Sequence, residues 1–212
     1  MTELPRQADP LALTVCRLSL DPVRGRLRRP HQVGIAVRAA IFTELAGTGR
    51  LVGSRAPEAV GDSDTGNPLP DAVHRAVAER RTTSWKRWYS HVDADRTAVT
   101  DALVAAGRWS SEAGRLVDLD PGSTVLEQQR IRQLLTARQL PQSLELALLV
   151  LLAGGHGAGP GRPAPRRSRR LVKPWLQPHL TTAGRGGDAT MAAVEAALVA
   201  MRRANPIPFS NR

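Results

Sequence analysis

The sequence has few cysteines, few aromatic residues and no long apolar run. The cysteine count limits the disulfides that can form, and the length of the apolar runs limits the membrane spans that are possible. Its 212 residues hold one cysteine, Cys16, so no disulfide forms within the chain. The longest apolar run, residues 144–153, is shorter than the roughly 18 residues that a membrane-spanning helix needs. The opening MTELPRQADP lacks the basic start and apolar stretch of a secretory signal. We therefore expect no membrane span and no signal, and a cytoplasmic location is the simplest interpretation.

Residues with catalytic potential are equally sparse. The histidines are scattered without the spacing of metal ligands, and they are His31, His74, His91, His156 and His179. The glycine-rich stretch 154–161 lacks the Gly-Lys-Ser/Thr ending of a phosphate-binding loop, and no Gly-x-Ser-x-Gly motif occurs. We therefore predict no catalytic residues, no metal, no cofactor and no enzymatic activity.

Arginine is what the chain has in excess. Basic residues outnumber acidic ones by 30 to 19, the net charge is +11, and Lys86 and Lys173 are the only lysines. A genomic preference for arginine codons would explain this excess. An anionic partner, such as a phosphate-bearing lipid, a nucleic acid or an acidic protein, would explain it too.

Apolar spacing predicts a mainly α-helical fold, a helical bundle around a central apolar helix with small β-hairpins. Leu144 to Ala153 is apolar nearly all round, which indicates the central, buried helix. Asp95 is expected to cap a helix over 93–109, and residues 107–120 should form a hairpin that turns at Glu112-Ala113-Gly114. The remaining boundaries are a disordered leader over 1–10, a single domain over 11–204, a Gly/Pro linker and basic loop over 154–170, and a loose tail over 205–212.

Arg38 is conspicuous because it lies in the middle of the apolar helix predicted over 33–46. A buried guanidinium is costly unless a carboxylate, backbone carbonyls or a phosphate meet it. Glu44 is six residues further on, about 240° round a helix, so it is not the natural partner. The partner is therefore either another carboxylate of the protein or a bound anion.

The segment WKRWY, residues 85–89, holds three of the seven aromatic residues, with Lys86 and Arg87 between them. Three interpretations are open. The segment is a stacking platform for nucleic acid, an amphipathic helix among lipid headgroups, or a piece of the core with Trp88 inside.

The order of these segments resembles the Golgi phosphoprotein 3 family. LSLDPVRGRL is similar to the family's leucine-rich start, turn and return strand, and VRAAIFTELAGTGRLVG is similar to its most recognisable helix. LPDAVHRAVAERRTTSWKRWYSHV, RTAVTDALVAAGRW and LEQQRIRQLLTARQLPQSLELALLVLLAGG continue the same order. The resemblance covers about residues 11–204.

The resemblance implies a mostly helical, non-enzymatic peripheral membrane protein that binds phosphatidylinositol 4-phosphate. It places Arg38 and Arg96 on the family's phosphate pocket, while Arg29 falls where the family has a Trp and Asp93 where it has another Arg. Arg29 and Arg87 are further candidates for the lipid phosphate.

The family also uses the hairpin for self-association and membrane contact, which here implies Trp109, Leu116, Val117 and Leu119. The expected partners are therefore an anionic phospholipid headgroup and a second copy of the chain. The expected location is cytoplasmic, on the inner face of a membrane. Two other functions stay open: an adaptor between proteins without lipid contact, and a basic helical protein that binds nucleic acid.

Overall fold

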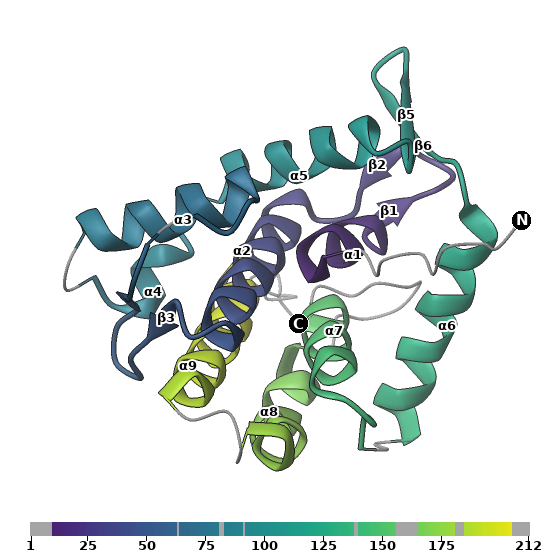
Figure 1. Ribbon diagram of the computed structural model, residues 1–212. Coiled ribbons are helices and arrows are strands. Elements are labelled where there is room, and N and C mark those ends of the chain that lie inside the picture. The colour runs from purple at the N-terminus through teal and green to yellow at the C-terminus, as the bar shows by residue number, and fades with distance from the viewer. Residues whose placement is uncertain are drawn as a thin grey trace, which may run out of the picture.

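The computed structural model describes residues 10–62, 64–80, 83–90, 92–137, 140–155, 165–180 and 185–204. Over these ranges the chain forms nine helices and three two-stranded antiparallel sheets, so the predicted mainly α fold with small hairpins is confirmed (Figure 1). The helices are α1 (Leu11–Arg17), α2 (Pro30–Gly47), α3 (Pro68–Glu79), α4 (Trp85–Trp88), α5 (Asp93–Ala105), α6 (Pro121–Ala137), α7 (Leu144–Gly155), α8 (Pro165–Leu180) and α9 (Arg185–Arg203). The strands are β1 (Leu20–Asp21), β2 (Arg26–Leu27), β3 (Leu51–Val52), β4 (Glu58–Ala59), β5 (Trp109–Glu112) and β6 (Arg115–Asp118).

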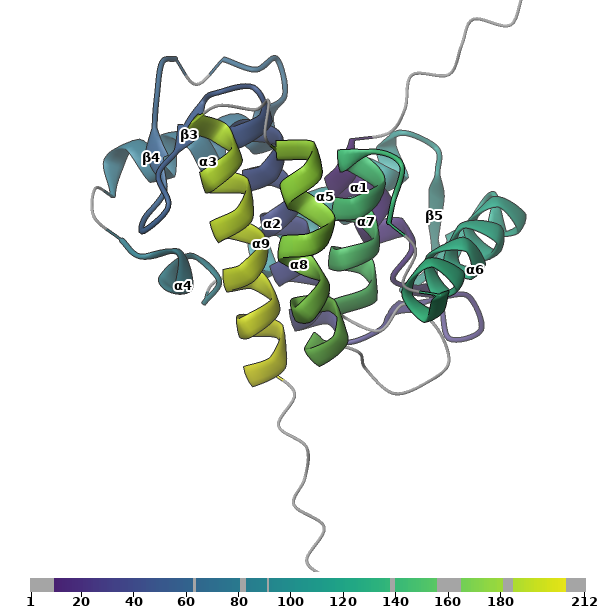
Figure 2. The same cartoon turned by 90° about the horizontal axis from the view of Figure 1, so that it is seen from below.

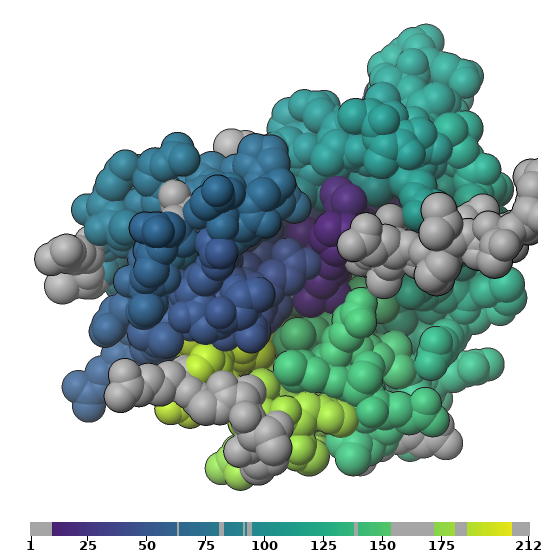
Figure 3. Space-filling view, in the orientation of Figure 1, coloured from purple at the N-terminus to yellow at the C-terminus, as the bar shows by residue number. Residues whose placement is uncertain are grey.

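Helix α2 is the element around which the others pack. Thirteen of its eighteen residues are buried, and its apolar side chains point in all directions. It contacts α1, α3, α5, α7 and α9. Figure 3 shows the surfaces of α1 and α2 between α3 and α5 above and α7 below. A helix that is apolar all round must be covered all round, which explains this position.

Helix α7 is buried as its composition predicts, and Ala147 to Ala153 are each at most 6% exposed. It lies beside α8, which in turn lies beside α9, so that the three form one layer of the molecule (Figure 2). Two apolar helices, α2 and α7, thus share the core, and α2 has the more central place.

Helices α2 and α9 approach each other closely at Gly186. A Cβ atom on Gly186 would lie 2.2 Å from the carbonyl oxygen of Ala46, so a larger residue does not fit without moving the backbone. The two helices are also joined by a hydrogen bond of 2.9 Å from Gln32 Nε2 to the carbonyl oxygen of Met201.

Two local predictions need correction. The basic cluster 166–170 lies inside helix α8 and not in a loop, because α8 begins at Pro165, a residue suited to the first turn of a helix. Asp95 does not cap α5, since the helix begins at Asp93 and the N-cap residue is Val92. Residues 1–9 of the predicted leader and the predicted tail 205–212 lie outside the described residues.

Candidate functional site

The side chain of Arg38 is held by groups of the protein itself. Its Nε donates to Asp95 Oδ2 at 2.5 Å, its Nη2 donates to Asp95 Oδ1 at 2.9 Å, and its Nη1 donates to the Trp88 carbonyl oxygen at 2.7 Å. The side chains of Arg38 and Asp95 are 13% and 8% exposed. This two-pronged pairing is the strongest geometry for an arginine and a carboxylate. Of the two partners that the sequence leaves open, the structure supplies an internal carboxylate.

The backbone brings this pair together at the junction of α2, α4 and α5. One helical turn before Arg38, α2 carries Gly34, and a Cβ there would lie 2.8 Å from Val92 Cγ2. The absence of a side chain at Gly34 lets the start of α5 approach α2 closely. Asp95 then projects from the first turn of α5 toward Arg38, where the helix dipole also favours a negative charge.

The aromatic residues of WKRWY belong to the core. Trp85, Trp88 and Tyr89 are each at most 5% exposed. Their rings meet the Phe42 ring edge to face, with centroids 5.2, 6.0 and 5.9 Å away. The interpretations of this segment as a stacking platform or as a headgroup-level helix are therefore wrong, because the rings are not accessible.

Burial sets the protonation of two groups beside this cluster. Burial raises the pKa of the Tyr89 phenol, against a smaller lowering by Arg38, and the hydroxyl donates to the Ala193 carbonyl oxygen at 2.8 Å. Burial also raises the pKa of the Cys16 thiol to about 12, although a hydrogen bond with Thr100 and the charge of Arg96 act in the other direction. Cys16 is thus a protonated core residue and not a nucleophile.

Arg87 and Arg96 lie beside the Arg38 ion pair. Arg87 precedes Trp88 and Arg96 follows Asp95, so each is the chain neighbour of a residue that the Arg38 guanidinium contacts. Arg87 is exposed and Arg96 is half-buried. Consecutive Cα atoms are about 3.8 Å apart, so Arg87 and Arg96 are close to the ion pair through the backbone, while their side chains have their own directions.

Arg29 lies further away, at the N-cap of α2, nine residues before Arg38 and therefore about 14 Å along the helix. Its φ of 50° is left-handed, a conformation that arginine adopts rarely. Its Nη1 atom is buried and has no hydrogen-bond partner among the described residues. Arg29 is thus a separate cation at the beginning of α2.

The chain matches the family model described as Golgi phosphoprotein 3 (GPP34) over residues 11–201, which is most of its length. The chain belongs to the Golgi phosphoprotein 3 family. A search of the curated proteins gives no match. Family membership indicates a Golgi phosphoprotein 3-like role in lipid or protein interaction, and the Golgi phosphoprotein 3 family is not a known enzyme family. Within the described ranges, every helix is too short or too polar to traverse a bilayer.

The hairpin of this family member presents a smaller apolar surface than its sequence indicates. Trp109 is 1% exposed and anchors the hairpin in the core, and Leu116 is half-buried against it. Val117 and Leu119 are 39% and 57% exposed. The hairpin is braced by the β1–β2 turn, because Leu116 N donates to the Gly25 carbonyl oxygen at 2.8 Å. Of the four predicted hairpin contacts, Val117 and Leu119 are the two that face outward.

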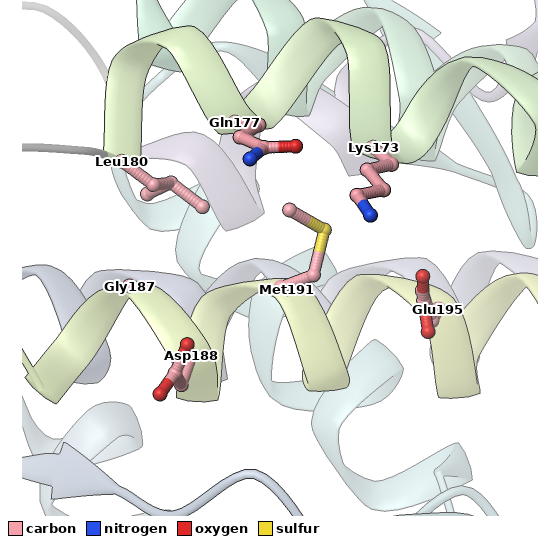
Figure 4. A pocket seen from close by; sticks show the side chains of 7 residues that line it. All are labelled: Lys173, Gln177, Leu180, Gly187, Asp188, Met191 and Glu195. Carbon is pink, nitrogen blue, oxygen red and sulfur yellow. The ribbon is translucent and has the colours of Figure 1, made fainter.

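A hollow of about 470 Å³ lies between α8 and α9 (Figure 4). Lys173 and Gln177 line it from α8, and Asp188, Met191 and Glu195 line it from α9. Its walls carry both signs of charge, and none of the predicted site residues lines it. Where side chains are described, no three of the types that bind metals (His, Cys, Asp, Glu) converge.

Proposed function

We propose that this member of the Golgi phosphoprotein 3 family is a peripheral membrane protein that binds anionic phospholipid headgroups. Phosphatidylinositol 4-phosphate or a similar phosphoryl lipid is the ligand class. The protein would work on the cytoplasmic, inner face of a membrane. The observation that supports this best is that Arg87 and Arg96 are the chain neighbours of Trp88 and Asp95, the two residues that hold the Arg38 guanidinium, in a chain of net charge +11. Guanidinium groups suit phosphate, because each offers several charged N–H donors.

The arginines have different proposed roles. Arg87 and Arg96 are the proposed primary phosphate ligands, since Arg87 is exposed and Arg96 is half-buried beside Asp95. Arg38 holds Asp95 and the carbonyl of Trp88, and it reaches a phosphate only by exchanging Asp95 for it. Arg29 is half-buried at the start of α2 and is the proposed second contact; its Nη1 has no hydrogen-bond partner among the described residues.

The test is co-flotation of purified protein with vesicles of phosphatidylcholine alone, or with phosphatidylserine or phosphatidylinositol 4-phosphate added. Charge-assisted hydrogen bonds contribute about 1.5–3 kcal/mol each, so Arg96→Ala and Arg87→Ala should each weaken binding about tenfold. The matched control is Arg130→Ala, which removes an exposed arginine from α6. If all three variants lose vesicle binding equally, the loss reflects net charge and not a specific site. If the protein binds no anionic vesicle, the proposal is refuted.

A second proposed role is self-association through the β5–β6 hairpin. The exposure of Val117 and Leu119 supports it, because apolar side chains at a hairpin edge gain from being covered. The charged neighbours Arg115 and Asp118 disfavour deep insertion into a bilayer. A second copy of the chain is therefore the partner that suits this surface better than lipid tails.

A further inference from the structure

An apolar pocket, open to solvent on one side, lies on the side of α2 that faces α1, α3 and α5. Its volume is about 340 Å³, and its walls come from all four helices and from the residues that precede α1 and α3. Most of the lining is apolar, and it includes Leu13, Ile41, Leu69, Ala98, Val99 and Ala102. This volume is at the lower end of the range of small-molecule sites in proteins.

One ionisable side chain, that of Glu44, is among the residues lining this cavity. Glu44 accepts hydrogen bonds from the backbone N–H groups of Leu11 and Ala12. Burial raises the pKa of the Glu44 carboxyl, the two hydrogen bonds act in the other direction, and the charge of Glu145 on α7 adds to the rise. In a chain with 30 basic residues, no ion pair within the described part of the protein involves Glu44.

The chemistry of the cavity therefore differs from that of the proposed lipid site, whose candidate residues are arginines. A carboxylate in an apolar wall repels fatty acids and phosphates, and Glu145 adds to this repulsion. The same carboxylate attracts a cation, and it does so more strongly in an apolar surrounding than in water. A ligand must then combine a positively charged nitrogen with an apolar body.

We propose that this cavity binds a small organic ammonium ion whose nitrogen pairs with Glu44 and whose apolar body packs between α3 and α5. The two backbone N–H groups of Leu11 and Ala12 hold the carboxylate in place in the wall of the pocket, and two hydrogen bonds leave it further lone pairs for a ligand. The site is independent of the proposed lipid site, because none of Arg29, Arg38, Arg87 and Arg96 lines it.

The experiment titrates the full chain with three probes of similar size at neutral pH: phenethylamine, phenethyl alcohol and hydrocinnamate. Binding is followed by isothermal titration and by backbone amide shifts in α3 and α5. The amine should bind at a single site and about tenfold or more tightly than the alcohol, since its nitrogen makes a charge-assisted bond. Hydrocinnamate should not bind.

Three variants locate the site. Glu44→Gln keeps an acceptor for the two N–H groups but removes the charge, so the amine should lose its advantage over the alcohol. Ala98→Phe should fill the cavity from the exposed wall of α5 and abolish binding of both probes while leaving Glu44 intact. Glu79→Gln removes an exposed carboxylate at the end of α3 and should change nothing.

Several results would overturn the proposal. They are equal affinity for the three probes, unchanged amine binding in Ala98→Phe, and a loss in Glu79→Gln as large as in Glu44→Gln. If Glu44→Gln does not fold, the Ala98→Phe variant and the comparison of the three probes still test whether the pocket binds an ammonium ion.

Discussion

At the scale of the single residue, the sequence around Arg38 is compatible with two partners for its guanidinium group. One is a carboxylate of the protein and the other is a bound phosphate. Carboxylate and phosphate oxygens are alternative partners for the same fork of N–H donors. The residue that decides between them, Asp95, is 57 positions away along the chain. Helical spacing correctly excluded Glu44 but had no means of finding a partner on another helix.

We predict that Arg38→Ala destabilises the protein by about 3–5 kcal/mol, the usual cost of leaving one member of a buried ion pair without its partner. Thermal and urea unfolding measure this, with Arg75→Ala on the exposed face of α3 as the matched control. An unchanged melting temperature would mean that the pair with Asp95 contributes little to the fold.

Asp95→Asn tests the same pair from the other side. The variant removes one negative charge beside Arg87 and Arg96 and releases Arg38 from its carboxylate, so binding to anionic vesicles should strengthen. Asp101→Asn, which removes an exposed carboxylate from the same helix, controls for net charge. Weaker vesicle binding in a folded Asp95→Asn protein would contradict the proposed place of the phosphate.

At the scale of the element, composition predicts burial better than it predicts surface roles. The segment WKRWY has the alternation of aromatic and basic residues that occurs in nucleic-acid and lipid surfaces, yet its three rings surround Phe42. Arg87 stays exposed while Trp88 is buried, because a short helix directs adjacent side chains to different faces. The hairpin shows the same division, with Trp109 inside and Val117 outside.

The hairpin prediction follows from that division. Replacing both Val117 and Leu119 by Ser should reduce self-association, because the two side chains are the exposed apolar part of the hairpin, and should leave the melting temperature nearly unchanged. Sedimentation velocity over a range of concentrations measures the first effect and thermal unfolding the second. Val125→Ser and Leu126→Ser on the neighbouring α6, also exposed, form the control pair. An equal loss of oligomer in the control pair would assign the contact to a wider surface than the hairpin.

At the scale of the whole molecule, the charge of +11 acts beyond any single contact. Salt shortens the screening distance from about 10 Å at 0.1 M to about 3 Å at 1 M, so long-range attraction to an anionic membrane fades over that range. We predict that flotation with phosphatidylserine vesicles falls steeply between these salt concentrations. Flotation with phosphatidylinositol 4-phosphate should fall less, since direct arginine–phosphate bonds persist. Identical salt curves for the two lipids would indicate binding by charge alone.

The sequence by itself determined that the chain is mainly helical and that the apolar segment 144–153 is buried, although it placed residues 166–170 of α8 in a loop. Spacing of apolar residues is a local property, and it specified α2, α7 and the hairpin with its turn at Ala113 and Gly114. The order of these segments was also enough to indicate the Golgi phosphoprotein 3 family, which the match over residues 11–201 confirms.

Only the tertiary structure decided which residues from different elements are in contact. It paired Arg38 with Asp95, turned the WKRWY rings inward, and placed Glu44 in the wall of an apolar pocket between four helices. Such contacts join residues far apart in the chain, and their geometry depends on how helices cross, for example on the close approach that Gly34 permits. The periodicity of a single helix carries no information on that crossing, because the same exposed or buried face is compatible with many neighbours.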